Sequence, residues 1–342
     1  MNICYLTGEQ INESNKSLEH IIPNALGGVL THRYVLTHDS NQKLNSDIDE
    51  EFNSIFESVH QRIALKKDRG KLGGIKAFHR DFGKNIIVRN GKCYPIEPFF
   101  DSKTNIVYAK DNKMGVSYSK YIARKENVEA DLIKVVTDMT GQFEVKFGFD
   151  NSIFKKGLAK IAAGFATYHG VSRDNLCGII DLNNNKFKDD ILIAPYLPTT
   201  NEESYFEENI HNSNYYTMHS LVLFGNSKDK LLYCYVELFS TYQYFIILND
   251  NYEGDDIYKN YFHSLSENTL FDYFDYKKSI PNSDDLSKLL PDEYRKYSKC
   301  YIQSMNNNLM FDLDLVKAYT HFKMNTLYSY INHINIKTKL NY

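Results

Sequence analysis

One stretch near the N-terminus has a residue pattern that differs from the rest of the chain. Residues 18–28 read Leu18-Glu19-His20-Ile21-Ile22-Pro23-Asn24-Ala25-Leu26-Gly27-Gly28. An acid and a histidine stand within a short apolar run, which ends at a proline and a glycine pair because Pro and Gly interrupt strands and favour tight connections. A second apolar stretch follows at residues 34–36. We therefore expect a strand over residues 18–22, a loop, and a second strand over residues 34–36.

The polar segment that begins at Asp39 has the periodicity of a helix. From Ser40 onward, apolar residues recur at spacings of three and four, namely Leu44, Ile48, Phe52, Ile55, Phe56 and Val59. This spacing places them on one face of an amphipathic helix, and Asp39 or Ser40 is its expected N-cap. The local prediction is strand, loop, strand and helix.

Together with residues 35–45, this stretch resembles the HNH endonuclease family. The resemblance is to the branch whose motif reads Glu-His-Ile-Ile-Pro, then Leu-Gly-Gly, then Leu-Cys-x-x-Cys-Asn, and it is specific over residues 4–50. It implies the ββα-metal fold, in which a two-stranded hairpin and a helix hold one divalent cation. It also implies phosphodiester hydrolysis, which needs a water nucleophile, a base for its proton and positive charge beside the phosphate.

The resemblance assigns roles to four residues of this motif. His20 corresponds to the general base, and its pKa class suits proton abstraction near neutral pH. Glu19 takes a metal-ligand position, Asn41 matches the last letter of the motif, and Asn45 lies one helical turn farther on the same face. Because adjacent strand residues point to opposite faces, Glu19 and His20 need a local twist or bulge to serve one centre. The implied cofactor is a single Mg²⁺ or Mn²⁺, since both are hard cations that prefer oxygen ligands.

The chain departs from the family pattern at its cysteines. Many members bind a structural zinc through two CxxC pairs, but here Cys4 is followed by Thr7, and the second pair has become Thr37 and Ser40. One thiolate cannot hold a tetrahedral zinc, so we expect no structural zinc and a brace made by packing and hydroxyl hydrogen bonds. The middle Asn of the family has two candidate counterparts, which are Asn24 and His32.

A basic segment follows the motif. Between residues 60 and 84, eight Lys and Arg face two Asp, and Gly70, Gly73 and Gly74 lie inside the stretch. A solvated loop is the alternative, but its place after the motif favours contact with nucleic-acid phosphates. The residues predicted to make this contact are Lys66, Lys67, Arg69 and Lys71.

The remaining chain predicts an α+β fold. Asn90-Gly91 indicates a hairpin, residues 151–170 a helix, and the runs 216–224, 231–239 and 243–248 an antiparallel meander. Residues 309–334 read as a helix. We expect the lysines of the 151–170 helix to form a solvated face and His219 to be a satisfied sheet residue. The predicted domains are an HNH module over residues 1–60, a basic linker over 61–84, and an α+β domain over 85–342 for target recognition, oligomerisation or regulation.

Composition narrows the class of protein. The chain has 342 residues, is 42% hydrophobic and 24% charged, and carries a net charge of −3, so it is globular and has no overall positive charge. Five scattered cysteines fit a reducing cytoplasm, and no apolar run is long enough to span a membrane. The partner implied by the resemblance is DNA, and the implied setting is defence against foreign DNA, with a second copy or a defence-system protein left open. The alternatives are an inactive nucleic-acid-binding protein on an HNH scaffold and an RNA-directed nuclease.

The basic segment generates a test of nucleic-acid binding. Replacing Lys66, Lys67 and Arg69 together by Ala should weaken binding to all sequences about equally and flatten the salt slope of log affinity by up to about three units, because each duplex phosphate contact contributes about 0.9. Filter binding over a salt series measures this. An unchanged slope would mean that the segment is a solvated loop.

Overall fold

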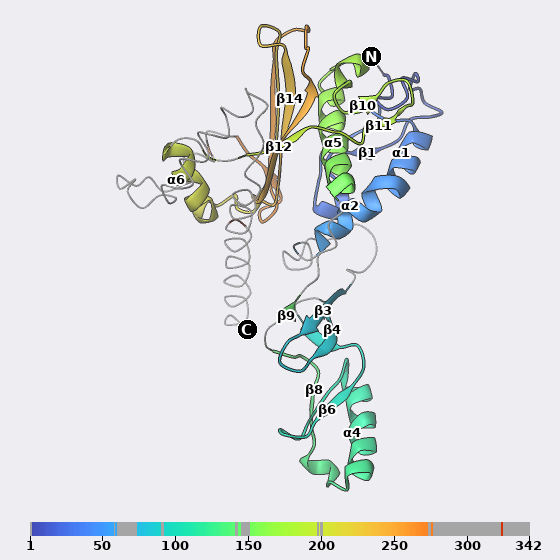
Figure 1. Cartoon of the computed structure of the whole chain (residues 1–342), viewed down its shortest axis with the longest axis vertical. Helices are drawn as coiled ribbons and strands as arrows, with labels where there is room; N and C mark the ends of the chain where they lie inside the picture. Colours follow the sequence, from blue (N-terminus) through green and yellow to red (C-terminus); the bar gives the residue numbers. More distant parts are fainter. Residues whose placement is uncertain are drawn as a thin grey trace. The chain divides into compact units, whose positions relative to one another are not determined.

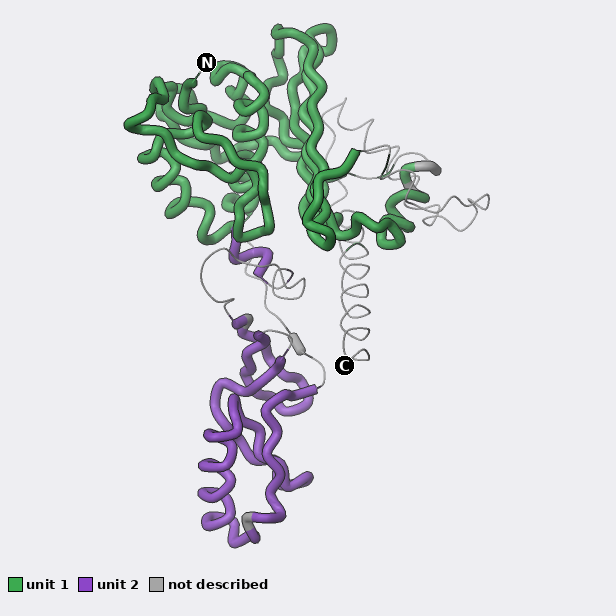
Figure 2. Tube along the Cα trace, turned by 180° about the vertical axis from the view of Figure 1, so that it is seen from behind, with its two compact units in different colours: residues 1–52, 150–342 green, residues 53–149 purple. Residues whose placement is uncertain are grey.

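The chain forms two compact units in this computed structural model. The structure describes residues 2–57, 59, 74–89, 92–140, 143–144, 151–196, 198, 201–272, 275 and 323. One unit combines residues 1–52 with 150–342, and the other comprises residues 53–149 (Figure 2). This division differs from the expected one. The N-terminal segment shares its unit with residues 150–342, and residues 85–149 belong to the other unit.

The N-terminal segment has the expected order of strand, loop, strand and helix. Its elements are β1 (Glu19–His20), the 3₁₀ turn η1 (Asn24–Leu26), β2 (Thr31–His32), α1 (His38–Leu44), the π-helical turn η2 (Asn45–Asp49) and α2 (Glu50–Ile55). β1 and β2 pair antiparallel. The apolar helical positions predicted from the sequence, from Leu44 to Val59, are all buried, which confirms the amphipathic face.

Two local expectations were wrong. The second strand lies at residues 31–32, and residues 35–36 are core residues instead: both are fully buried, and the Val35 carbonyl accepts a hydrogen bond from the Tyr5 amide at 3.0 Å. The N-cap of α1 is Thr37, whose hydroxyl accepts the Ser40 amide at 3.4 Å. The helix therefore begins before the predicted caps.

The larger part of this unit is built on a six-stranded antiparallel sheet. Its strand order is β12-β15-β14-β13-β16-β17. The strands are β12 (Ile193–Pro195), β13 (Met218–Asn226), β14 (Leu231–Leu238), β15 (Tyr242–Asn249), β16 (Ile257–Ser264) and β17 (Thr269–Leu270). The expected meander is confirmed as β13-β14-β15. The remaining elements are η4 (Arg173–Leu176), the hairpin of β10 (Ile180–Asp181) and β11 (Lys186–Phe187), α6 (Asn201–Asn209) and η5 (Ile210–Asn212).

Helix α5 (Asn151–Tyr168) lies between this sheet and the N-terminal segment (Figure 1). On the sheet side, Phe154 contacts the rings of Tyr242 and Tyr244 in β15. On the other side, a Cβ on Gly157 would lie 2.1 Å from the Phe52 ring, and one on Gly164 would lie 3.2 Å from Ile21. Small residues at these positions let α5 approach the N-terminal segment closely, so the HNH-like motif is packed onto a helix far along the chain.

The described residues of the second unit form two small sheets and one long helix. The antiparallel sheet β5-β4-β3-β9 and the sheet β6-β7-β8 each cover a small apolar core. The elements are β3 (Ile75–His79), β4 (Lys84–Arg89), β5 (Lys92–Pro95), β6 (Phe99–Asp101), β7 (Ile106–Tyr108), α4 (Asn112–Glu126), η3 (Ala130–Leu132), β8 (Lys134–Val136) and β9 (Phe143–Glu144). The pairing of β4 with β5 confirms the hairpin predicted around residues 90–91.

The chain as a whole is of the α+β class, because its helices are combined with sheets that are mostly antiparallel. The predicted helix over residues 309–334 lies outside the described residues except for Lys323. No helix within the described part has the length and apolarity that a membrane crossing requires.

The close approach of α5 generates a stability test. Gly157→Ala should lower the free energy of unfolding by about 1–3 kcal/mol, because the new methyl group meets the buried Phe52 ring. This cost should appear although Ala favours a helix by about 1 kcal/mol. Gly164→Ala is the matched control, since its methyl group meets only the end of the Ile21 side chain. Equal urea midpoints for the two variants would contradict the close docking.

Candidate functional site

The loop of the motif has a shape that its glycines permit. Gly27 closes η1 with a left-handed φ of 89°, a conformation that favours glycine. At Gly28, a Cβ would lie 2.0 Å from the Ile22 carbonyl oxygen, so a side chain there has no room. The glycine pair therefore folds the loop back onto β1 and sets the start of β2.

Glu19 and His20 lie on opposite faces of the β1–β2 ribbon. Glu19 pairs with His32 and His20 with Thr31, in regular antiparallel register. Side chains alternate along a strand, so Glu19 shares its face with His32. Glu19 is 6% exposed, whereas His20 is half-buried. No bulge interrupts the register of these two residue pairs.

Glu19 belongs to a buried ion cluster. The Lys160 ammonium of α5 lies 2.8 Å from Glu19 Oε1 and 2.5 Å from Asp49 Oδ2 at the end of η2. Lys160 is 5% exposed and Asp49 is 8% exposed. We call these three residues the Lys160 triad. The prediction that Lys160 belongs to a solvated helix face was wrong, because the N-terminal segment covers it.

The charges of the triad do not balance. Two carboxylates face one ammonium, and the second oxygen of Asp49 is buried without a hydrogen-bond partner. The buried Tyr5 hydroxyl also has none, and burial together with the Glu19 and Asp49 carboxylates raises its pKa well above the usual value. Burial raises the pKa of the Glu19 carboxyl, although Lys160 opposes this shift. Burial disfavours the Lys160 ammonium, but the two carboxylates outweigh it and raise its pKa.

Asn41 lies at the triad and Asn45 does not contact it. The Asn41 amide donates to Ser17 Oγ at 2.8 Å, and its hydrogen bond to Glu19 acts to lower the pKa of that carboxyl. Asn45 is exposed at the junction of α1 and η2 and has no side-chain hydrogen bond within the described part of the chain. Of the three proposed metal ligands, Glu19 and Asn41 come together.

The two candidates for the middle Asn occupy different places. His32 stands opposite Glu19 on the hairpin, its Nδ1 accepts the Tyr34 amide at 3.2 Å, and its ring meets Tyr168 of α5 edge-on. Burial lowers the pKa of His32. Asn24 begins the η1 turn. His32 is thus the candidate that shares a face with Glu19.

Hydroxyl groups connect the positions where the family carries cysteines. The Thr37 hydroxyl donates to Ser40 Oγ at 2.9 Å, and the Cys4 thiol donates to the same oxygen at 3.4 Å. All three residues are buried. These bonds are the hydroxyl brace expected from the sequence, and they tie the N-terminal turn to the start of α1.

His219 attaches the motif loop to the sheet. It lies on β13 and is fully buried; its Nε2 donates to the Leu26 carbonyl at 2.8 Å, and its Nδ1 accepts the Phe239 amide at 3.2 Å. Both ring nitrogens have partners, which confirms the expectation of a satisfied sheet histidine. Burial lowers the pKa of His219 to about 3, so the ring is neutral in the folded chain.

Comparison with known proteins agrees with the motif and its local fold. Residues 4–57 match the HNH endonuclease family. We call residues 4–57 the HNH segment. No curated protein and no solved structure matches the chain. The match ends within unit 2, so the family covers the strand–loop–strand–helix region and not the sheet that packs on it.

The HNH segment offers oxygen ligands suited to a divalent cation. Among the described residues, no group of three or more His, Cys, Asp and Glu side chains is arranged around one point. Mg²⁺ needs fewer, because it keeps several waters and binds through one or two carboxylates plus substrate phosphates. The Glu19 carboxylate, the Asn41 amide and the unpartnered oxygen of Asp49 fit this requirement.

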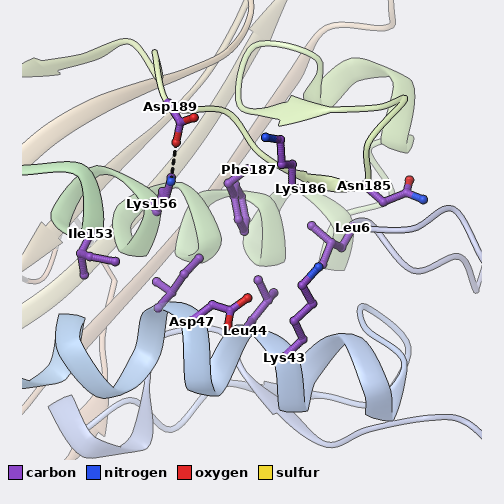
Figure 3. A pocket seen from close by; sticks show the side chains of 11 residues that line it. Leu6, Lys43, Leu44, Asp47, Ile153, Lys156, Asn185, Lys186, Phe187 and Asp189 are labelled. Carbon is purple, nitrogen blue, oxygen red and sulfur yellow. Dashed lines mark hydrogen bonds and ion pairs between the residues drawn. The ribbon is translucent and has the colours of Figure 1, made fainter.

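A separate cavity of about 240 Å³ lies between the segment of α1 and η2 on one side and α5 with the β11 region on the other (Figure 3). Its lining includes Lys43, Lys156 and Lys186 together with the apolar side chains of Leu44 and Phe187. Lys156 is paired with Asp189 at 2.6 Å. None of Glu19, His20, Asn41 and Asn45 lines this cavity. The predicted phosphate contacts Lys66, Lys67, Arg69 and Lys71 lie outside the described residues.

Sequence reasoning missed Asp49 and the role of Lys160. A signal for Lys160 was present, since it stands alone in the apolar run 157–166 and shares a helical face with Gly157 and Gly164. A charge in such a run indicates a buried partner. Asp49 is one acid among several in its helix, and only its contact with Lys160 distinguishes it.

The burial of His219 predicts a pH dependence of stability. An unfolded histidine takes up a proton near pH 6.5, but folded His219 stays neutral down to about pH 3. Its stabilising contribution is therefore complete above pH 6.5 and falls by about 1.4 kcal/mol per pH unit below it. As the pH falls from 7.5 to 5.5, wild type should therefore lose about 1.4 kcal/mol more of its free energy of unfolding than His219→Gln loses. Urea unfolding measures this, and exposed His38→Gln is the control. A wild-type pH profile in His219→Gln would refute the assignment.

Proposed function

We propose that the chain is a metal-dependent endonuclease that hydrolyses phosphodiester bonds in DNA. The observation that carries this proposal is the HNH segment itself, in which the hairpin and α1 bring Glu19 and Asn41 together and place His20 on the adjoining strand position. A nucleic-acid substrate follows from the nuclease family of the segment.

In the proposed mechanism His20 is the general base. It is half-buried on β1, and an imidazole is the side chain that most often takes a proton from water in general base catalysis. His20 lies on the face of the β1–β2 ribbon opposite Glu19, so the proposal requires the ribbon to twist when substrate binds and bring both side chains to one phosphate.

Glu19 and Asn41 are the proposed metal ligands, with Asp49 beside them and Asn45 as a further prediction. A divalent cation bound there, Mg²⁺ or Mn²⁺, would supply positive charge to the scissile phosphate and the leaving oxygen. Lys66, Lys67, Arg69 and Lys71 are the proposed phosphate contacts outside the site. A role in defence against foreign DNA, with a partner protein or a second copy of the chain, belongs to the same proposal.

One observation favours a second candidate function. The Glu19 carboxylate is already paired with Lys160, and an ion-paired carboxylate is a weaker metal ligand than a free one. In a protein that binds nucleic acid on an HNH scaffold without cleaving it, this ion pair would persist with and without nucleic acid bound. Cleavage therefore has to be measured separately from binding.

A plasmid assay tests the nuclease. Wild-type protein should nick plasmid DNA with Mg²⁺ or Mn²⁺ and not with EDTA. His20→Ala should slow cleavage by about 10²–10⁴-fold, because a positioned general base contributes that much. Asn41→Ala should also abolish cleavage, and His38→Ala should not, since His38 is exposed on α1.

Three outcomes separate the candidates. Gel-shift binding without cleavage by the wild type would favour the inactive scaffold. Faster cleavage of RNA than of DNA of the same sequence would reassign the substrate. Full activity of His20→Ala would refute the assignment of the base.

A further inference from the structure

The Lys160 triad brings a cation of the protein to the place where the proposed function requires a metal ion. Lys160 Nζ lies 2.8 Å from Glu19 Oε1, and Glu19 is the carboxylate proposed as a metal ligand. The same ammonium lies 2.5 Å from Asp49 Oδ2. Like a metal ion bridging two acids, it joins a carboxylate from the hairpin to one from the helix.

The packing holds this ammonium in place. Gly157 and Gly164 flank Lys160 on the same face of α5 and allow the helix to meet Phe52 and Ile21 closely. The Lys160 side chain is therefore covered on both sides along the helix, and its head group cannot reach solvent without separating α5 from the segment. Its pairing with Glu19 is a property of the folded core.

We propose that Lys160 is a built-in competitor of the divalent cation, a positioning residue that holds Glu19 and Asp49 and keeps the affinity of the free protein for metal low. The inference rests on the proposed role of Glu19 as a metal ligand. A divalent cation at Glu19 is repelled by the neighbouring ammonium and has to share the carboxylate with it. The unpartnered oxygen of Asp49 and the excess negative charge of the triad leave the site able to accept a cation once this competition is removed.

This role differs from that of an ordinary stabilising ion pair. A buried lysine that serves stability alone would leave the metal affinity unchanged when it is removed, or would lower it by loosening the site. Competition predicts the opposite, because the two carboxylates then lack a counter-ion. The direction of the change in metal affinity is thus the decisive readout.

Titration of the full-length protein with Mn²⁺ in the absence of nucleic acid tests the proposal, with free Mn²⁺ followed by electron paramagnetic resonance. Lys160→Met removes the ammonium and keeps an unbranched side chain of similar length. It should bind one Mn²⁺ at least about tenfold more tightly than wild type, because charges within a few ångströms interact strongly in a buried site. Lys156→Met, one turn earlier on α5 and paired with Asp189, should bind as wild type does.

A second change links the gain to the triad. In Lys160→Met combined with Glu19→Gln, the gained affinity should be lost. Equal Mn²⁺ affinity of Lys160→Met and wild type, including no measurable binding by either, would overturn the proposal. Survival of the gain in the double variant would overturn it as well, because Glu19 would then not be the shared ligand.

A second pair of variants, which buries one carboxylate fewer, covers the case in which Lys160→Met does not fold. If Lys160→Met does not fold because two carboxylates are buried without a counter-ion, Asp49→Asn combined with Lys160→Met is compared with Asp49→Asn alone. The same gain of at least about tenfold is expected, since Glu19 again loses its competitor. Equal affinities in this pair would overturn the proposal.

The outcome is independent of the cleavage assay. If Lys160→Met gains Mn²⁺ affinity but the wild type does not cleave plasmid, the proposal that Lys160 competes with the metal ion stands and the proposed nuclease activity is wrong. If the wild type cleaves plasmid but Lys160→Met gains no Mn²⁺ affinity, the proposed nuclease activity stands and the proposal that Lys160 competes with the metal ion is wrong.

Discussion

The contact between Lys160 and the two carboxylates of the HNH segment is the interaction on which the arrangement of this unit depends. It joins residues 111 positions apart in the chain and lies within the interface of α5 with the N-terminal segment. Burial makes each of these charges costly, so the three are tolerable only together. Removing Lys160 leaves two buried carboxylates uncompensated, and a wrong placement of α5 would do the same. The triad therefore specifies how the segment and the helix meet.

The docking of α5 supplies support that many family members obtain from zinc. In those proteins four thiolates hold the hairpin against the helix, whereas here Cys4, Thr37 and Ser40 share weak hydrogen bonds. Additional support comes from His219, which hydrogen-bonds the Leu26 carbonyl of the loop, and from α5, which packs against the ends of β1 and α2. Both belong to the part of the chain beyond residue 150. The sheet and α5 thus act as a scaffold for the small motif, which by itself has only a two-residue ribbon and short helices.

The same scaffold shapes the chemistry of the site. It buries one face of the β1–β2 ribbon, and with it Glu19, while the other face carries His20. Glu19 and His20 consequently differ in burial, although they are neighbours in sequence. On the buried face, the number of negative charges exceeds the number of positive ones, which is an unusual feature in a protein core.

The sequence by itself determined the motif, its family and most local structure. The Pro and Gly-Gly of residues 23–28 specify a tight loop, and the spacing from Leu44 to Val59 specifies a buried helical face. The runs of the meander pair as antiparallel strands, as expected. These features depend on neighbours along the chain. Tertiary structure alone decided the partner of Glu19, the burial of Lys160, the importance of Asp49 and the union of residues 1–52 with 150–342. These features depend on contacts between segments more than a hundred residues apart. The helix propensity of a lysine is the same whether its ammonium lies in solvent or contacts two carboxylates. Which of the two it meets is settled by the packing of α5.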